Sequence, residues 1–200
     1  VENDGKAAAL AELWLGNLNG IDNGAAVVLG TGVGGGLILN GRLHTGTHFQ
    51  AGELSFMHRG EARFDTDSYG VVGSAVQMVS TIATIYNLPD KKDGRAVFEL
   101  INKHDGPAWD VFKRYTDDIA LMLLNIQAVV DLERFVIGGG ITAQPIVVQT
   151  IRESYEELVA RRPQVRDGFT TPEILPARFG NDANLFGALY HLLMRVNHED

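Results

Sequence analysis

A glycine-rich stretch between residues 25 and 42 constrains the fold of this chain more than any other feature. The aliphatic run Val27-Val28-Leu29 meets five glycines within seven residues, and a second aliphatic run, 37–39, leads into Asn40-Gly41. Asn-Gly is the strongest short signal for a two-residue turn between antiparallel strands. The stretch is therefore predicted to contain an antiparallel β-hairpin whose loop is rich in glycine.

The same glycines predict a bound anion. The glycines, among them Gly30, Gly32 and Gly34, would form a turn of successive backbone N–H groups with no side chains in the way, which suits a phosphate, and Thr31 adds one hydroxyl. The segment satisfies G-x-G-x-x-G, but a dinucleotide fingerprint must open a helix, and here a strand follows. The Walker pattern G-x-x-x-x-G-K-[ST] does not occur in the sequence. A hairpin without a ligand is the alternative, although glycines weaken strands and need a reason.

A second glycine cluster, Gly138-Gly139-Gly140, follows the apolar run 134–137. That run is typical of a short buried strand, and ligands of open α/β sheets sit at the carboxyl ends of strands. Three successive glycines leave room for a ribose or a flat ring on the backbone, whereas the alternative is a tight strand-to-helix turn. Two clusters that both follow strands suggest the two ends of one nucleotide.

Apolar residues at helical spacing predict most of the remaining elements. Asn3 or Asp4 is a plausible N-cap of the first helix, and Asn181 or Asp182 of the last. The predicted helices run from this first cap to Gly16 and over about 74–86, 94–103, 107–130, 145–160 and 182–193, with a last strand at 173–177. No regular element is predicted for 57–69. Strands that alternate with helices, plus one hairpin, indicate an α/β fold with a mixed sheet.

The composition excludes several classes of function. The 200 residues are 45% hydrophobic and 21% charged, as in an ordinary globular domain, and the net charge of −8 argues against a nucleic-acid partner. There is no cysteine, which excludes disulfides and thiolate metal sites. No apolar run approaches the ~20 residues that span a bilayer, so no membrane partner is expected. A cytoplasmic location follows as the expectation.

Five segments, in order, resemble motifs of the ROK family (repressors, open reading frames and sugar kinases). Residues 2–12 resemble E-N-D-A-N-x-A-A-L-x-E, residues 29–36 the phosphate loop L-G-T-G-I-G-G-G, and residues 41–53 the sugar-binding stretch N-G-x-x-x-x-G … A-G-E. Residues 135–141 are similar to the adenosine segment I-V-I-G-G-G-I, and residues 180–188 to the closing L-G-x-x-A-x-x-x-G-A. The resemblance implies an actin-like (RNase H-like) ATPase domain that phosphorylates a hexose or hexosyl glycoside hydroxyl with ATP.

The resemblance also implies roles for individual residues. Asp4 would be the general base that takes the proton of the sugar hydroxyl, a step that typically contributes ~10²–10⁴-fold. Asn3 would hydrogen-bond ring hydroxyls, and Gly52 and Glu53 would complete the sugar site. ATP, with Mg²⁺ to neutralise its phosphates, would lie on the two glycine clusters. Without the resemblance, Asp4 would be a helix N-cap and Glu53 a solvated loop acid.

Two departures from the family pattern affect this interpretation. Typical members have G-E-I-G-H and then the zinc motif C-x-C-G-x-x-G-C, whereas here Phe56 stands in place of that histidine and no cysteine follows. Zinc is not expected, and His44, His48 and His58 are a poor replacement because thiolates dominate structural zinc sites. The family's first phosphate motif, D-x-G-G-T, does not occur either. Residues 1–200 are therefore expected to be a C-terminal sugar- and ATP-binding domain that is inactive alone.

Two other functions compete with a kinase. A sugar-sensing transcriptional repressor of the same family would carry its DNA-binding module upstream, but family repressors generally carry the zinc motif. A degenerate domain that serves only as a dimer partner is disfavoured by the intact Asn3, Asp4, Thr31 and Glu53. The zinc-free subset of the family contains sugar and glycoside kinases. The expectation is therefore a kinase of a small-molecule sugar, in a homo-oligomer as is common in the family.

Overall fold

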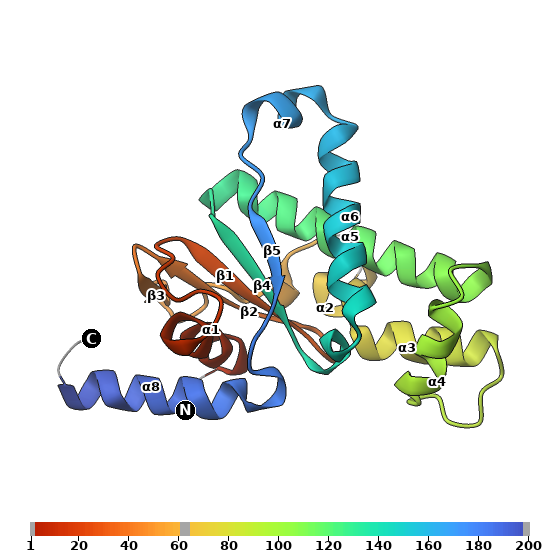
Figure 1. Cartoon of the computed structure of the whole chain (residues 1–200), viewed down its shortest axis with the longest axis horizontal. Helices are drawn as coiled ribbons and strands as arrows, with labels where there is room; N and C mark the ends of the chain where they lie inside the picture. Colours follow the sequence, from red (N-terminus) through yellow and green to blue (C-terminus); the bar gives the residue numbers. More distant parts are fainter. Residues whose placement is uncertain (1–2, 61–64, 198–200) are drawn as a thin grey trace.

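The computed structural model describes residues 3–60 and 65–197 and contains one mixed sheet of five strands between helical layers (Figure 1). Glu2, which opens the first motif, lies outside the described residues, as does the side chain of Asn181. The strand order is β3-β2-β1-β4-β5. The strands are β1 (Gly24–Leu29), β2 (Val33–Leu39), β3 (Arg42–His44), β4 (Arg134–Gly138) and β5 (Glu173–Pro176). β1, β2 and β3 are antiparallel neighbours, whereas β4 is parallel to β1 and β5 to β4.

Helices cover both faces of this sheet (Figure 1). On one face lies α1 (Asp4–Leu15), against which α8 (Ala183–Asn197) packs. The other face is covered by α5 (Gly106–Val130) and α6 (Pro145–Ala160), and α3 (Ala75–Ile85) and α4 (Gly94–Ile101) extend from α5. The short helices are α2 (Tyr69–Val72), α7 (Pro163–Gly168) and the 3₁₀ turns η1 (Leu54–Phe56), η2 (Asp65–Asp67), η3 (Gly140–Ala143) and η4 (Gly180–Asp182). No helix of the described residues is long and apolar enough to cross a membrane.

The glycine-rich stretch forms two successive hairpins. Leu29 pairs with Val33, so β1 and β2 are joined by a loop of residues 30–32, as the sequence predicts. Asn40-Gly41 forms the next connection, between β2 and β3, with φ values of 53° and 73°. Positive φ at both central residues is the signature of the tight hairpin turn that Asn-Gly favours. The sequence pattern thus located the turn correctly but did not predict β3.

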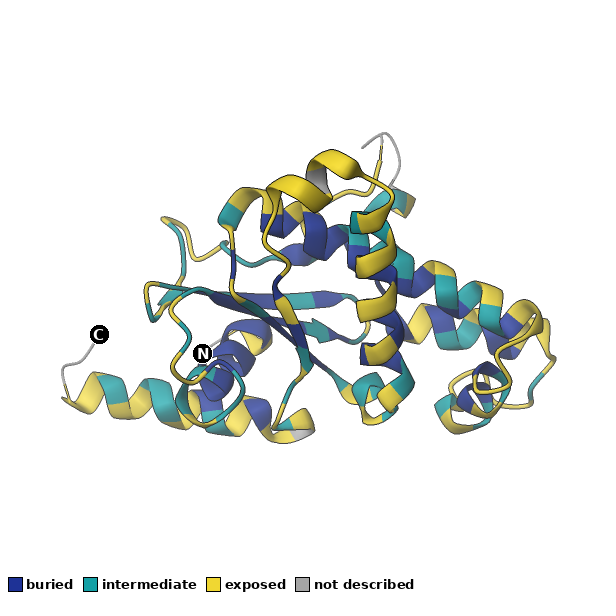
Figure 2. Cartoon of the chain, turned by 45° about the horizontal axis from the view of Figure 1, so that its top comes forward, coloured by how far each residue is buried: buried dark blue, intermediate teal, exposed yellow. Residues whose placement is uncertain are grey.

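Alternation along β1 divides the apolar core between the two faces. Ala25, Val27 and Leu29 belong to the large cluster formed with α3 to α6, whereas Ala26 belongs to the cluster under α1. Figure 2 shows the resulting pattern, in which the sheet and the inward sides of the helices are buried and the outward sides of the helices are exposed. The predicted helices and strands all form, and those missed (β3, α2 and α7) are too short to show a period.

Gly36 of β2 allows α1 to lie directly on the sheet, and Gly35 allows the η1 turn to pack against the same strand. A Cβ at Gly36 would come within 2.6 Å of the Ala9 Cβ, and a Cβ at Gly35 within 2.6 Å of the Leu54 Cδ1. Real Cβ atoms are not found at such distances from one another, so larger residues would push the helix and the η1 turn away. Part of the glycine cluster is therefore required by packing.

Helix α8 crosses α1 equally closely at Gly187. A Cβ at this position would overlap with the carbonyl oxygen of Ala7. Further along the two helices, Trp14 stacks on Tyr190 with 5.2 Å between the ring centroids. The crossing holds α1 between the sheet and α8.

We predict that Gly187→Ala lowers the free energy of unfolding by about 2 kcal/mol, because overpacking a tight contact typically costs ~1–3 kcal/mol. Denaturant unfolding of the full-length protein measures the change. Gly94→Ala is the matched control, since a Cβ built at Gly94 meets nothing within 4 Å, and a glycine-to-alanine change without strain is neutral or stabilising. Equal stability of the two variants would contradict the close crossing.

Candidate active site

Several of the residues singled out by the sequence lie together at one edge of the sheet, where β1 and β4 end and α1 begins. A cavity of about 250 Å³ is lined there by Asp4, Gly30 and all three glycines of the second cluster, Gly138, Gly139 and Gly140. Segments more than a hundred residues apart in the sequence therefore share one site. The cavity opens between α1 and the ends of the two strands.

Asn3, not Asp4, caps helix α1. The Asn3 Oδ1 accepts hydrogen bonds from the backbone amides of Gly5, at 2.9 Å, and Lys6, at 3.4 Å. Asp4 is then the first helical residue, where the helix dipole favours a carboxylate. Its side chain is exposed and makes no hydrogen bond or ion pair within the described part of the chain. Asp4 thus presents an uncommitted carboxylate to the cavity.

Glu53 is fixed by two residues of the first turn of α1. The Asn3 Nδ2 and the Lys6 Nζ both donate to the Glu53 Oε1, each at 2.9 Å. The Lys6 side chain is only 4% exposed, whereas the Glu53 side chain is 30% exposed. Among the described residues, nothing hydrogen-bonds the Glu53 Oε2. One carboxylate oxygen is therefore held in place and the other is available to a ligand.

Lys6 is the residue of this site that the sequence interpretation missed. It is the charged member of an otherwise small and apolar run, Gly5 to Leu10, and a lysine is almost never fully buried unless it is paired. A lysine within this apolar run was therefore the signal in the sequence that could have identified the residue. The partner, Glu53, lies 47 residues away, which no local pattern could indicate.

Gly52 shapes the loop rather than offering a group of its own. Its φ is +82°, and a Cβ would lie 3.0 Å from the Gly35 carbonyl oxygen. This conformation is strained for any residue with a side chain. Gly52 thus lets the loop close against β2, which brings Glu53 opposite Asn3.

The hairpin loop is hydrogen-bonded to the start of α3, and two of its backbone amides have no protein partner among the described residues. The Gly30 carbonyl accepts a hydrogen bond from the Ala75 amide at the start of α3, at 2.9 Å. The Gly30 amide donates to the Gly32 carbonyl, at 3.0 Å. Within the described residues, the amides of Thr31 and Gly32 donate to no protein group. Free amides in a turn are the groups that bind phosphate. Gly34, in contrast, lies in β2 and faces Gly5 of α1 rather than the loop.

The second glycine cluster combines a tight turn with an open surface. Gly139 has φ +100°, and a Cβ there would overlap with the Leu29 carbonyl oxygen, so this position requires glycine for packing. Gly140 begins η3, and a Cβ at Gly140 meets nothing within 4 Å. The cluster therefore contains one glycine that the tight turn requires and one whose position is open, and binding of a ligand on the open one stays a prediction.

Gly30 and Gly140 also line a second, larger cavity on the other side of the loop. It measures about 450 Å³, and its walls are largely apolar side chains of α3, α4 and η3 (Ala75, Val76, Val79, Phe98, Ile141, Ala143). Lys92, Arg95 and Gln144 supply its polar groups. Because Gly30 and Gly140 line both cavities, a ligand could extend from Asp4 past the hairpin loop into the larger, apolar cavity.

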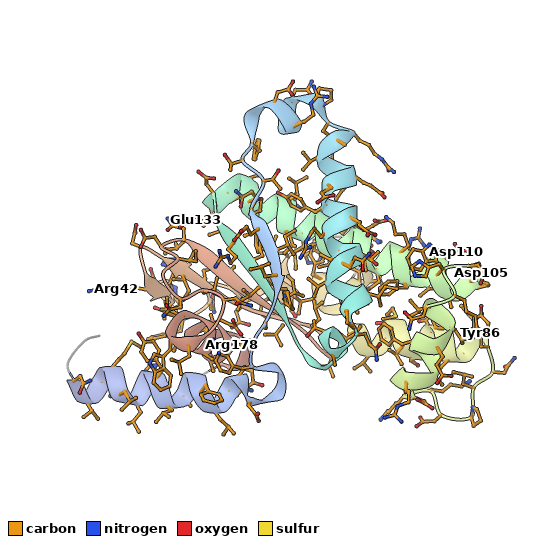
Figure 3. The ribbon with its side chains drawn as sticks, viewed as in Figure 1. Arg42, Tyr86, Asp105, Asp110, Glu133 and Arg178 are labelled. Atoms are coloured by element: carbon orange, nitrogen blue, oxygen red, sulfur yellow. The ribbon has the colours of Figure 1, made fainter. Side chains whose placement is uncertain are left out.

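Glu12 also lines the smaller cavity, but its carboxylate is used by the fold. It is 1% exposed, its Oε1 accepts from the Arg178 amide at 2.6 Å, and its Oε2 accepts from the Asn17 amide at 2.7 Å. Arg178 follows β5 and also reaches the Leu15 carbonyl at the end of α1 (Figure 3). Asp4 is left as the carboxylate of this cavity that is free to react.

An ion-pair cluster occupies the region after Phe56, where the family pattern places its zinc motif. The Arg59 guanidinium forms ion pairs with Asp118 of α5, at 2.8 Å, and with Asp67, at 3.2 Å. Burial raises the pKa of the Asp118 carboxyl despite this partner, and burial also raises the pKa of Tyr69 to about 12. Within residues 3–60 and 65–197, no group of three His, Cys, Asp or Glu side chains could hold a metal ion. Arg59 thus ties this segment to α5.

The chain belongs to the ROK family, whose model matches residues 1–195. A beta-glucoside kinase of Listeria monocytogenes is 29% identical over 204 residues, which cover 100% of this chain and 66% of that protein. An N-acetylmannosamine kinase of Haemophilus influenzae is 31% identical over 195 residues, which cover 94% of this chain and 61% of that protein. This chain therefore spans a little under two thirds of the length of these relatives.

A solved structure confirms the fold expected from the resemblance. The ROK family protein from Streptococcus pneumoniae TIGR4, in complex with sucrose, matches with a TM-score of 0.88 and 29% identity, over 98% of this chain and 66% of that protein. The fold is the actin-like ATPase fold, an α/β architecture with a mixed sheet and flanking helices.

We predict that Glu53→Gln destabilises the protein by about 1–3 kcal/mol, because it leaves the buried Lys6 ammonium without a counter-charge. The loss should be below the ~3–5 kcal/mol of a fully buried pair, since Glu53 is 30% exposed. Denaturant unfolding of Glu53→Gln, Lys6→Met and the double variant measures the coupling of the pair. The double variant should be less destabilised than the sum of the single variants.

Glu156→Gln provides the control for loss of an acidic charge, because Glu156 is exposed on α6 far from Lys6. Its effect should be within the usual surface range of about ±0.5 kcal/mol. Strict additivity of the changes in unfolding free energy for Lys6→Met and Glu53→Gln would show that the ion pair contributes nothing to stability.

Proposed function

We propose that this chain is the sugar- and ATP-binding domain of a kinase that transfers the γ-phosphoryl group of ATP to a hydroxyl of a hexose or hexosyl glycoside. The observation that carries the proposal is the uncommitted carboxylate of Asp4 in the same cavity as the hairpin-loop glycine Gly30 and the Gly138–Gly140 cluster. The relatives named beta-glucoside kinase and N-acetylmannosamine kinase support it, since both names state phosphorylation of a sugar.

In this proposal the first turn of α1 and the loop before η1 hold the sugar. The Asn3 side chain and the free Oε2 of Glu53 bind ring hydroxyls, while Lys6 keeps the Glu53 carboxylate in position. The reacting hydroxyl then lies against Asp4. Because one glutamate oxygen is fixed by two donors, the direction in which the other accepts a hydrogen bond is defined before the sugar arrives.

The nucleotide would extend through both cavities. Its terminal phosphates would accept hydrogen bonds from the amides of Thr31 and Gly32, and its adenosine would lie on Gly140 in the larger apolar cavity. Positioning and charge stabilisation account for nearly all catalysis of phosphoryl transfer. Mg²⁺ bound to the phosphate oxygens would neutralise their charge.

The chemical step is an in-line displacement at the γ-phosphorus. The sugar oxygen forms a bond to phosphorus as the bond from phosphorus to the β,γ-bridging oxygen breaks, and ADP leaves with that electron pair. The proton of the sugar hydroxyl passes to the Asp4 carboxylate. A sugar-sensing repressor would need the sugar contacts but not this base, and the exposed Asp4 without a structural partner therefore favours the kinase.

We predict that Asp4→Asn in the full-length protein lowers kcat by about 10²–10⁴-fold, the usual contribution of a positioned proton acceptor, with little change in the KM for sugar. A coupled ADP-release assay over hexoses, amino sugars and β-glucosides measures this and identifies the substrate class. Asp110→Asn, at an exposed position of α5 (Figure 3), should leave kcat unchanged.

Two outcomes would count against the kinase. Turnover in Asp4→Asn equal to that of the unaltered protein would exclude Asp4 as the base. Thermal stabilisation by a sugar with no turnover of any sugar would instead support a sensor or repressor.

The larger cavity generates a separate prediction for the nucleotide. Ala143→Trp would fill the space proposed for adenosine with an indole ring and should raise the KM for ATP at least about tenfold, which corresponds to ~1.4 kcal/mol of lost binding free energy. The KM for sugar should hardly change. Ala160→Trp, at the exposed end of α6, is the matched control, and an unchanged KM for ATP in Ala143→Trp would place the adenosine elsewhere.

A further inference from the structure

Ser55 connects the loop that carries Glu53 to the hairpin loop that carries Thr31 and Gly32. It lies in the η1 turn, and its Oγ accepts a hydrogen bond from the Val33 amide and donates one to the Val33 carbonyl, both at 3.0 Å. Val33 is the first residue of β2, directly after the hairpin loop. One hydroxyl therefore binds both backbone polar groups of the residue on which the loop ends.

The edge of the sheet leaves the backbone amide and carbonyl of Val33 available to Ser55. β3 pairs with β2 only at residues 37–39, so within the described part of the chain no strand neighbours the outer edge of β2 at Val33. A backbone amide and carbonyl at such an edge need other partners. Ser55 supplies both, and a Cβ at Gly32 would lie 3.0 Å from the same Oγ. The hydroxyl thus bonds Val33 and occupies the space that a side chain at Gly32 would need.

The other end of this connection is the sugar site. Glu53 immediately precedes η1, and the turn is closed by hydrogen bonds from the Phe56 amide to the Glu53 carbonyl, at 3.2 Å, and from the Met57 amide to the Leu54 carbonyl, at 3.1 Å. Leu54 is 5% exposed and packs against β2 at Gly35. Glu53 and Ser55 belong to one short, packed turn, so a displacement of one is transmitted to the other.

We propose that Ser55 is a positioning residue that couples sugar binding to nucleotide binding. This inference rests on the function proposed above. A sugar that binds the Glu53 Oε2 adds a further contact that stabilises η1, and through the two Ser55–Val33 hydrogen bonds it also stabilises the arrangement in which the amides of Thr31 and Gly32 accept phosphate oxygens. The nucleotide binds more tightly to the sugar-bound protein, and by linkage the sugar binds more tightly to the nucleotide-bound protein by the same factor.

The contact depends on a side chain that the G-E-I-G-H pattern does not contain. Ser55 stands at the second glycine of the G-E-I-G-H pattern, and a glycine has no hydroxyl to offer. Removal of the hydroxyl is therefore a small change at a position where the loop can be built without it, which makes Ser55→Gly and Ser55→Ala suitable test variants.

The experiment measures binding of a nonhydrolysable ATP analogue with Mg²⁺ to the full-length protein by calorimetry, without sugar and with saturating glucose or cellobiose, whichever supports turnover. We expect the sugar to tighten analogue binding at least about fivefold, the lower end of typical coupling between sites. In Ser55→Ala and Ser55→Gly this ratio should fall close to one, while the affinity without sugar changes little. Ser55→Thr, which retains the hydroxyl, should restore the ratio.

Ser154→Ala separates coupling from general stability. Ser154 is fully buried, and its Oγ contacts Lys113 and Thr116 between α5 and α6, away from both loops. It should lower stability and leave the ratio unchanged. A ratio of one in the unaltered protein, or an undiminished ratio in Ser55→Ala and Ser55→Gly, overturns the proposal for Ser55 alone. Absence of any binding of the analogue, with or without sugar, overturns the proposed function together with it.

Discussion

The contact of α1 with the glycines of β2 is the constraint on which the site depends. Gly5 of the helix lies against the backbone of Gly35, and Gly36 leaves room for Ala9. Glycine at position 36 of the strand and at position 5 of the helix allows this close approach, because a Cβ at either would overlap with the other element. This approach brings the start of α1 beside the hairpin loop, and α8 holds the helix there through Gly187. Backbone packing therefore places Asn3, Asp4 and Lys6 beside the loop, and the hydrogen bonds of Asn3 and Lys6 to Glu53 then fix the facing segment.

The glycines of the two clusters divide into those that the fold requires and those that a ligand would use. Gly35, Gly36 and Gly139 are required by neighbouring backbone or side chains, whereas added Cβ atoms at Gly30 and Gly140 would meet only open space. Open glycines at two strand ends, which line both cavities, are a better indication of a ligand than the number of glycines in the sequence. Packing accounts for some glycines of the hairpin and not for Gly30, so phosphate binding by the loop remains a prediction.

Much of the fold could be predicted from the sequence because its signals are local. The Asn40-Gly41 turn, the period of α5 and the apolar strand before Gly138 each depend on a few neighbouring residues. The site could be predicted only in part. Roles for Asp4 and Glu53 came from resemblance to the ROK family, whereas the ion pair of Lys6 with Glu53 and the bonds of Ser55 to Val33 join residues 47 and 22 positions apart. Such contacts arise from the tertiary arrangement and leave no periodic signal.

The central claim is that the small cavity beside Asp4 is where a sugar hydroxyl meets the terminal phosphate. A crystal structure of the full-length protein with a nonhydrolysable ATP analogue, Mg²⁺ and the sugar that supports turnover tests it most directly. The account predicts a sugar hydroxyl at hydrogen-bond distance, about 2.6–3.2 Å, from a carboxylate oxygen of Asp4, and γ-phosphate oxygens on the amides of Thr31 and Gly32. A sugar bound away from Asp4 and Glu53, or phosphates bound away from the hairpin loop, would contradict it.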